Sequence, residues 1–233
     1  MPMTAVQAHR GSPDEAAGVH ENTLEAFGRS RRLGADGVEL DVRLTRDGAL
    51  AVHHNPVIPD RGPIVELTAG QLPGSVPLLA DALEVCAGLV VNIEMKDLPG
   101  EPGYDPSEPL AASVADMVVA EGRVTSVVVS SFWPEALDAI HRACPEIATG
   151  LLVAHWFEPA ECVAVALSRS CTSVHPHVSL VDEALVARAH DSGLSVAAWT
   201  VNDKLEVSEL ASIGVDTVIT DDVLLALSAL DRG

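Results

Sequence analysis

The chain has 233 residues, of which 34 are acidic and only 14 are Lys or Arg, so its formal net charge is −20. This balance argues against nucleic acid or an anionic membrane as a partner, because no basic surface could neutralise many phosphates. Hydrophobic residues make up 48% of the chain and aromatic residues 3%, which indicates a core of Val, Leu, Ile and Ala, typical of buried parallel strands covered by helices.

The four cysteines (Cys86, Cys144, Cys162 and Cys171) show no Cys-x-x-Cys spacing, and the first residues lack the basic and then apolar pattern of a secretory signal. No apolar run approaches the ~20 residues that a membrane-spanning helix needs. We therefore expect a cytoplasmic protein with reduced thiols and no stable membrane insertion, built as a single domain over residues 1–233. The oligomeric state is left open.

A strand over residues 6–9 and a helix after residue 22 are the first predicted elements. Asn22 followed by Glu25 has the spacing of a capping box, which predicts Asn22 as the residue that caps this helix, and Gly34 is expected to end it.

The second predicted strand, residues 37–42, carries Glu39 and Asp41 on one face, because side chains alternate along a strand with period two. The apolar run 50–54 follows a turn at residues 45–48 too closely for a parallel crossover. We expect this run to be the return arm of a β-hairpin, outside the main sheet.

The next segment, residues 56–77, is rich in Pro and Gly and is predicted to be a loop with one short helical turn, followed by a helix over residues 78–86. The third strand, residues 89–96, again has one polar face, with Asn92, Glu94 and Lys96. Such a face cannot point at packed helices.

Strands and helices then alternate to the end of the chain. Apart from the hairpin arm we count eight candidate parallel strands, which predicts a (β/α)8 TIM barrel. An open doubly wound sheet is the alternative, but no Gly-x-Gly-x-x-Gly follows the first strand. The further predicted strands are 127–131, 149–153, 172–175, 195–200 and 217–220, and the further helices are 110–118, 134–143, 159–167, 182–191, 203–213 and 221–230.

Three carboxylates are expected at the mouth of this barrel, those of Glu39, Asp41 and Glu94. Ionised carboxylates this close repel one another, and an all-oxygen set of ligands favours a hard divalent cation, Mg²⁺ or Ca²⁺. Salt bridges to Arg or Lys of the barrel are the alternative for any one of them.

Two histidines, His9 and His54, also end predicted strands and can reach the mouth. Beside a metal they are candidates for an acid and base pair, since the ordinary pKa of about 6.5 allows either form near neutrality. Arg10 and Lys96 are candidates for binding an anionic group, with a surface or carboxylate-paired role as the alternative. Trp199 is a candidate wall for the substrate, or a core residue.

These residues fall in an ordered series of motifs that resembles the glycerophosphodiester phosphodiesterase family, whose members are TIM barrels similar to the phosphatidylinositol phospholipases C. The resemblance covers essentially the whole chain. Its motifs are His9-Arg10-Gly11, Glu21-Asn22-Thr23, Gly34-Ala35-Asp36-Gly37-Val38-Glu39-Leu40-Asp41-Val42, Thr45-Arg46-Asp47-Gly48, Asn92-Ile93-Glu94-Met95-Lys96, Ser130-Ser131-Phe132, Trp199-Thr200-Val201-Asn202, Gly214-Val215-Asp216 and Thr220-Asp221.

The resemblance implies a metal-dependent enzyme that hydrolyses a small glycerophosphodiester to glycerol 3-phosphate and an alcohol. A hydroxyl of the substrate's own glycerol would attack phosphorus, and water would then open the cyclic phosphate. By motif position the metal ligands would be Glu39, Asp41 and Glu94, the acid and base His9 and His54, and the phosphate contacts Arg10 and Lys96.

Two departures from the family pattern leave alternatives open. Asn55 stands after His54 where the family usually has Asp, which removes a carboxylate and makes His53 an alternative base. The region 59–63 is shorter than in the family, so the substrate scope stays open. The alternatives are a lysophospholipase D-like enzyme on the same fold and an inactive barrel that acts as a binding protein.

Overall fold

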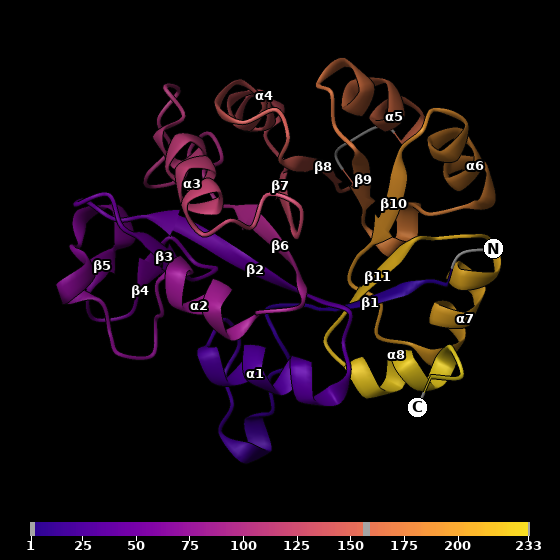
Figure 1. Ribbon diagram of the computed structural model, residues 1–233, viewed down its shortest axis with the longest axis horizontal. Coiled ribbons are helices and arrows are strands. Elements are labelled where there is room, and N and C mark those ends of the chain that lie inside the picture. Colours follow the sequence, from indigo (N-terminus) through magenta and orange to yellow (C-terminus); the bar gives the residue numbers. More distant parts are fainter. Residues whose placement is uncertain (1–2, 156–158, 233) are drawn as a thin grey trace.

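A closed barrel of eight parallel strands forms the centre of the molecule (Figure 1), in a computed structural model that describes residues 3–155 and 159–232. Each strand pairs with two neighbours, and β1 closes the ring by pairing with both β2 and β11. The predicted TIM barrel is confirmed. Its strands are β1 (Ala5–Ala8), β2 (Gly37–Leu44), β6 (Val90–Met95), β7 (Val127–Ser131), β8 (Ala148–Val153), β9 (Ser173–Pro176), β10 (Ser195–Ala198) and β11 (Thr217–Thr220).

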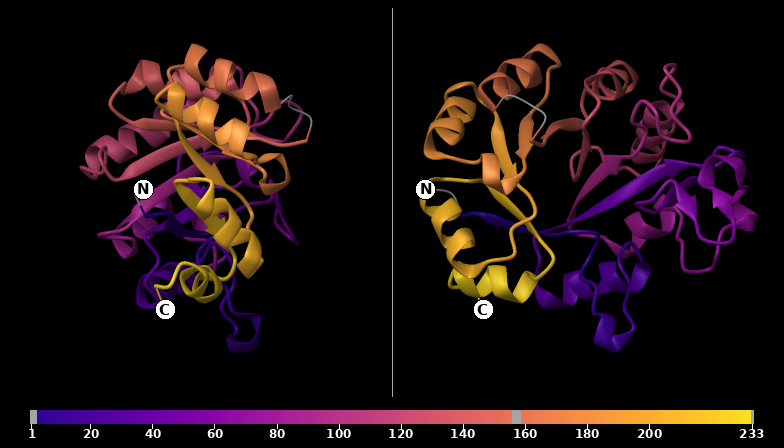
Figure 2. Two further views of the ribbon diagram at one scale, coloured as in Figure 1. Left: turned by 90° about the vertical axis from the view of Figure 1, so that its right-hand side faces the viewer. Right: turned by 180° about the vertical axis from the view of Figure 1, so that it is seen from behind.

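One α-helix follows every barrel strand, and together the helices surround the barrel in Figure 1 and in the views of Figure 2. Among the described residues no helix is both long and apolar enough to cross a bilayer. The helices are α1 (Leu24–Leu33), α2 (Leu79–Val85), α3 (Pro109–Ala120), α4 (Pro134–Ala143), α5 (Pro159–Ser168), α6 (Glu183–Asp191), α7 (Lys204–Ser212) and α8 (Val223–Ala229).

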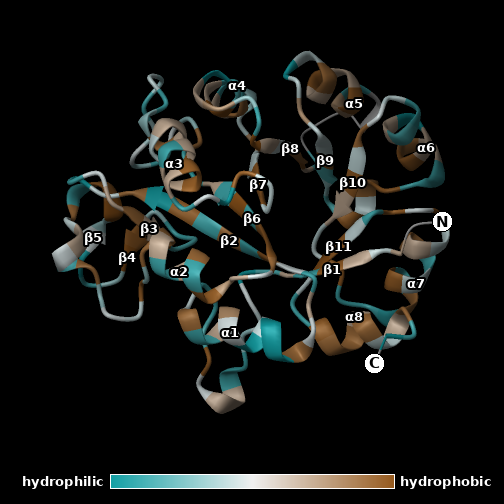
Figure 3. Ribbon diagram, in the orientation of Figure 1, coloured by the Kyte–Doolittle hydropathy of each residue, from teal (hydrophilic) through white to brown (hydrophobic). Residues whose placement is uncertain are grey.

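The two faces of the barrel strands differ in chemistry. On β2, the side chains of Val38, Leu40 and Val42 are fully buried in the apolar core, whereas Glu39 and Asp41 alternate with them and face the barrel interior. Figure 3 shows this as hydrophilic bands on β2 and β6 within mostly hydrophobic strands. Burial of both faces therefore places charged groups inside the barrel.

The hairpin arm after β2 is confirmed, since β3 (Leu50–Val52) pairs antiparallel with β2 and lies outside the closed barrel. The prediction of a loop with one helical turn for residues 56–77 is wrong. A small hairpin, β4 (Val57–Ile58) and β5 (Gly62–Pro63), is followed by two 3₁₀ turns, Ile64–Glu66 and Ala69–Gln71. The physical reason is a separate apolar cluster that these bends bury: Ala51, Ile58, Ile64 and Leu67.

The predicted cap of α1 is also wrong by one residue. Thr23 is the N-cap, and its hydroxyl accepts a hydrogen bond from the backbone N–H of Ala26 at 3.3 Å. Asn22 instead has a left-handed backbone with φ 54°, and its amide donates to Oδ2 of Asp41 at 2.7 Å. A tertiary contact with a site carboxylate has taken the amide away from local capping, while Gly34 ends the helix as expected.

The barrel interior is filled partly by His175, whose ring is buried and contacts the Ser173 hydroxyl at 2.8 Å. Gly150 on β8 leaves the space for this ring, because a Cβ at that position would overlap the imidazole. Burial lowers the pKa of His175 to about 4, so the ring is neutral at pH 7. The neutral side chain of His175 therefore fills space inside the barrel.

We expect Gly150→Ala to destabilise the fold by about 1–3 kcal/mol, the usual penalty for overpacking a filled core. Gly74→Ala is the matched control, since nothing lies within 4 Å of its added Cβ, and it should leave stability nearly unchanged. Urea unfolding of both variants measures the effect. Equal stabilities of the two variants would contradict this packing argument.

Candidate active site

A cavity of about 210 Å³ opens at the carboxyl ends of the barrel strands. It brings together all of the predicted site residues except Asp41, which is fully buried and is the register partner of Glu94 in the sheet. Parallel strands that end at one mouth explain the convergence. The cavity is lined by His9, Arg10, Glu39, His54, Asn92, Glu94, Lys96, Ser130, Phe132, Leu152, Trp199 and Ile219.

The turn after β1 sets the orientation of His9 and Arg10, the first two site residues in the chain. Arg10 and Gly11 both have left-handed backbones, with φ 54° and 82°. Glycine is required at the second position because a Cβ there would lie 2.8 Å from the Cβ of Ala26. The turn directs the backbone N–H of Arg10 at Oε2 of Glu39, to which it donates at 2.8 Å.

The three acidic side chains form one compact group. Glu39, Asp41 and Glu94 each offer a carboxylate oxygen, and these atoms lie within 4.8 Å of one another. Oε1 of Glu39 is buried and accepts no hydrogen bond from any described residue, whereas the buried Oδ1 of Asp41 lies 3.2 Å from Lys96 Nζ. A buried oxygen atom without a donor, in an all-carboxylate set, fits a hard divalent cation such as Mg²⁺ or Ca²⁺.

Both predicted phosphate-binding cations pair with these carboxylates. Lys96 Nζ lies 2.6 Å from Oε1 of Glu94 and 3.2 Å from Oδ1 of Asp41, and Arg10 Nε lies 3.3 Å from Oδ2 of Asp41. Carboxylate pairing, the alternative role, therefore occurs here. Both side chains also line the cavity, so each can face an anionic ligand from its present position.

Protonation differs among the three carboxyl groups. Burial and the charges of Asp41 and Glu94 raise the pKa of Glu39 to about 8. Burial also raises the pKa of Glu94, although Lys96 opposes the shift. For Asp41 the effect of burial is outweighed by Lys96 and Arg10, which lower its pKa. Glu39 is thus the group that holds a proton when no cation compensates the cluster.

His9 belongs to a chain of hydrogen bonds that sequence reasoning missed. Its Nδ1 lies 2.7 Å from Oδ1 of Asp221, and Asn202 donates to the other oxygen of Asp221 at 2.6 Å. Burial lowers the pKa of His9, but Asp221 and Glu39 outweigh it and the net pKa is raised. The sequence signal for this contact is the position of the two residues: His9 directly follows the first barrel strand and Asp221 directly follows the last.

His54 has a neutral partner instead. Its Nδ1 lies 3.1 Å from Oδ1 of Asn55, an amide oxygen that can only accept, so Nδ1 carries the hydrogen and Nε2 is the free basic atom. Burial lowers the pKa of His54, and Asp41 offsets this only in part. His53 does not line the cavity, and its ring contacts the backbone oxygen of Asn55 at 2.9 Å.

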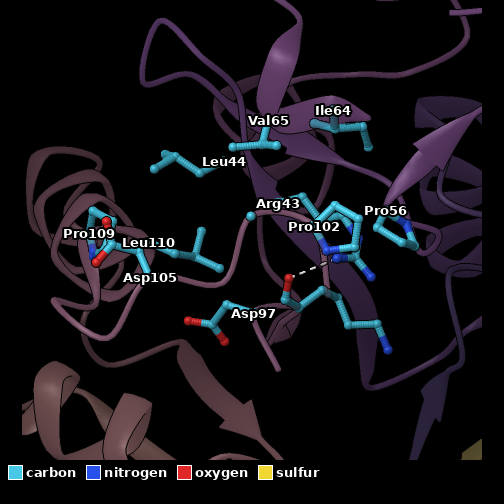
Figure 4. Close-up of a pocket in the computed structure, with 12 residues that line it drawn as sticks. Arg43, Leu44, Pro56, Ile64, Val65, Asp97, Pro102, Asp105, Pro109 and Leu110 are labelled. Carbon is cyan, nitrogen blue, oxygen red and sulfur yellow. Dashed lines mark hydrogen bonds between the residues drawn. The ribbon is translucent and has the colours of Figure 1, made fainter. Parts of the chain in front are cut away.

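Arg43 on β2 fixes the positions of two site residues. The sequence did not single this residue out. Its buried guanidinium donates twice to the backbone oxygen of His54, at 2.8 and 2.7 Å, and once to that of Lys96, at 2.9 Å. Figure 4 shows Arg43 among the residues that line a small cavity of about 20 Å³. Glu101 balances the charge of Arg43 at 2.9 Å.

Aromatic rings form one wall of the main cavity. Trp199 and Phe132 both line it and meet edge to face, with ring centroids 5.6 Å apart. The indole N–H of Trp199 donates to the backbone oxygen of His175 at 2.6 Å, which holds the ring in place. Trp199 therefore combines the two roles considered for it, since it is packed and also faces the cavity.

Comparisons with known proteins all lead to the same family. The Glycerophosphoryl diester phosphodiesterase family matches residues 9–225. A glycerophosphodiester phosphodiesterase of Caldanaerobacter subterraneus is 32% identical, over 99% of each chain. An Oleispira antarctica phosphodiesterase, solved in complex with the product sn-glycerol-3-phosphate, is 25% identical with a TM-score of 0.83, over 98% of this chain and 97% of that one. A Thermotoga maritima glycerophosphodiester phosphodiesterase is 26% identical with a TM-score of 0.77, over 98% and 99%.

The carboxyl cluster predicts an unusual titration. In protein freed of divalent cations, the carboxyl carbon of Glu39 should titrate with a midpoint at about pH 8, and Asp41→Asn should lower this midpoint because it removes the neighbouring negative charge that raises the pKa of Glu39 most. Carbon-13 NMR of the labelled protein measures both values. A midpoint for Glu39 near the ordinary glutamate value, unchanged in Asp41→Asn, would contradict the described arrangement.

Proposed function

Because the chain belongs to the glycerophosphoryl diester phosphodiesterase family and is therefore a phosphoric diester hydrolase, we propose that it hydrolyses glycerophosphodiesters to glycerol 3-phosphate and an alcohol with the help of one divalent cation. The supporting observation is the meeting of three carboxylates, two histidines and two cationic side chains around one cavity. A binding protein would need no pair of histidines with opposite pKa shifts.

The cation, Mg²⁺ or Ca²⁺, would be held by Glu39, Asp41 and Glu94. When bound, it supplies positive charge that stabilises the negative charge developing on the phosphoryl oxygens. The proton of Glu39 must leave as the cation binds, since only ionised carboxylates are good ligands. The unpaired Oε1 of Glu39 supports this assignment.

Arg10 and Lys96 are proposed to bind the phosphoryl group. Both lie on the cavity wall beside the carboxylates, and a cation that compensates Asp41 and Glu94 would release their side chains to face an anion. Arg43 keeps Lys96 in place through its backbone oxygen. The apolar carbons of the substrate would lie against the rings of Trp199 and Phe132.

The two histidines are proposed to move the protons. His54, whose pKa is lowered, takes the proton of the attacking glycerol hydroxyl on its free Nε2. His9, whose pKa is raised by Asp221 and Glu39 in spite of burial, gives a proton from Nε2 to the leaving alcohol, while Asp221 holds its Nδ1. The roles reverse when water opens the cyclic phosphate.

The proposal predicts release of glycerol 3-phosphate from glycerophosphocholine, glycerophosphoethanolamine or glycerophosphoglycerol. Mg²⁺ or Ca²⁺ should support the reaction and a chelator should abolish it, because the uncompensated carboxylates would repel the phosphodiester. An assay coupled to glycerol-3-phosphate dehydrogenase measures the rate. His9→Ala and Glu94→Ala should each lower kcat by at least about 10²-fold while remaining folded.

Ser179→Ala is the control for these variants, since the Ser179 hydroxyl contacts His177 and Ser179 does not line the cavity, and it should retain full activity. Lysophosphatidylcholine serves as the alternative substrate. Turnover of lysophosphatidylcholine alone would replace the proposed substrate class, and the absence of any turnover with every metal would reject the enzymatic proposal. Normal activity of Glu94→Ala would reject the three-carboxylate site.

The contact of His54 with the neutral side chain of Asn55 predicts how the activity depends on pH. The base acts in its neutral form, so activity falls as the pH drops through the pKa of His54. Asn55→Asp places a negative charge beside the imidazolium, raises this pKa by about one unit, and should move the acid limb of the kcat profile to higher pH. Asn55→Ala, which removes the contact without adding charge, should lower kcat and leave the limb in place or at lower pH.

An acid limb that stays in place in Asn55→Asp would show that His54 is not the group that titrates. The same measurement on His53→Gln separates the two neighbouring histidines, because His53 does not line the cavity. That variant should keep the acid limb of the unaltered enzyme.

A further inference from the structure

The floor of the main cavity contains two polar side chains without partners. Asn92 and Ser130 are 1% and 0% exposed, yet both line the cavity. Neither the amide nitrogen nor the amide oxygen of Asn92, nor the hydroxyl of Ser130, has a hydrogen-bond partner among the described residues. Buried polar atoms are normally paired, so unpaired ones that face a cavity indicate a polar group that binds there.

The two residues lie diagonally on the neighbouring strands β6 and β7, since the register partner of Asn92 is Val128. Asn92 on β6 precedes Glu94 by two residues, and Ser130 on β7 is the register partner of Glu94. Both therefore lie next to the carboxylate cluster and deeper than the two cations. The apolar floor residues are Leu152 and Ile219, which leaves Asn92 and Ser130 as the neutral hydrogen-bonding groups there.

We infer that Asn92 and Ser130 form a subsite for the terminal hydroxyl of glycerol, the hydroxyl that does not attack phosphorus. This inference rests on the proposed function and specifies its substrate class. An amide and a hydroxyl together offer a donor and an acceptor to one alcohol group. The apolar floor residues and the ring of Phe132 then contact the glycerol carbons.

The subsite makes the enzyme select a free terminal hydroxyl. A site that hydrogen-bonds a substrate hydroxyl rejects an analogue without it, because the buried polar groups of the protein stay unpaired. A 1-acyl lysophospholipid carries an ester at this carbon, so its chain would have to enter a closed floor next to Asn92. The subsite therefore favours glycerophosphodiesters over lysophospholipids.

A pair of substrates tests the subsite. The first is glycerophosphocholine, and the second is its analogue built on propane-1,2-diol, which keeps the attacking hydroxyl and replaces the terminal CH₂OH by CH₃. Choline release reports both reactions. The unaltered enzyme should prefer glycerophosphocholine in kcat/KM by a factor on the order of 10⁴, and lysophosphatidylcholine should not be turned over.

Asn92→Leu should reduce this preference by about 100-fold or more, mainly through loss of kcat/KM for glycerophosphocholine, while the rate with the analogue changes little. Ser130→Ala, a smaller change, should reduce the preference in part. Gln7→Leu is the matched control, because Gln7 also has an unpaired amide oxygen inside the barrel but does not line the cavity. It should retain the preference of the unaltered enzyme.

Thermal unfolding separates this role from a structural one. Asn92→Leu removes unpaired buried polar atoms and should have a Tm at least as high as that of the unaltered enzyme, whereas a structural Asn92 would make the variant less stable. Equal kcat/KM for both substrates in the unaltered enzyme, or full preference in Asn92→Leu, would overturn the subsite. No choline release from either substrate would instead overturn the proposed function.

Discussion

Mutual repulsion of three buried carboxylates is the constraint on which the rest of the site depends. Two ionised carboxylates about 4 Å apart repel by about 4 kcal/mol at an effective dielectric constant of 20, and Glu39, Asp41 and Glu94 form three such pairs at comparable spacing. The protein compensates with Lys96 and Arg10 around Asp41 and with a proton on Glu39. A divalent cation can take over both functions, which is why binding it would free the two cationic side chains for an anionic substrate.

Much of this arrangement followed from the sequence, because it depends on two regularities. Side chains alternate along a strand, which put Glu39 and Asp41 on one face, and parallel strands of a barrel end at one mouth, which brought Glu94 and His9 to them. The contact between His9 and Asp221 depends on closure of the barrel between residues 212 positions apart. No local pattern encodes that closure, although the eight strands implied it.

Local patterns failed where a tertiary contact offered a side chain a stronger partner. Asn22 has the sequence signature of a helix cap, but its amide binds Asp41, and the neighbouring Thr23 caps the helix instead. The long Arg43 side chain could not be assigned from its strand position either, since its partners are backbone oxygens on the hairpin arm and at the end of β6. Side-chain reach and register decide such contacts, and they become visible only in the folded barrel.

Unpaired buried polar atoms mark this site more directly than any motif. Within the described residues they occur inside the barrel and at its mouth, whereas three buried groups on the adjacent rim, those of Asp97, Glu108 and Trp133, hydrogen-bond to one another. The apolar layer between strands and helices contains none of the unpaired side-chain atoms found in that part of the chain. An unpaired buried group lowers stability by about 1–3 kcal/mol, so a fold that tolerates several of them in one cavity must offset this elsewhere. The well-packed outer layer provides that stability, and the cavity retains the unpaired groups that a cation and a small polyhydroxylated substrate can satisfy.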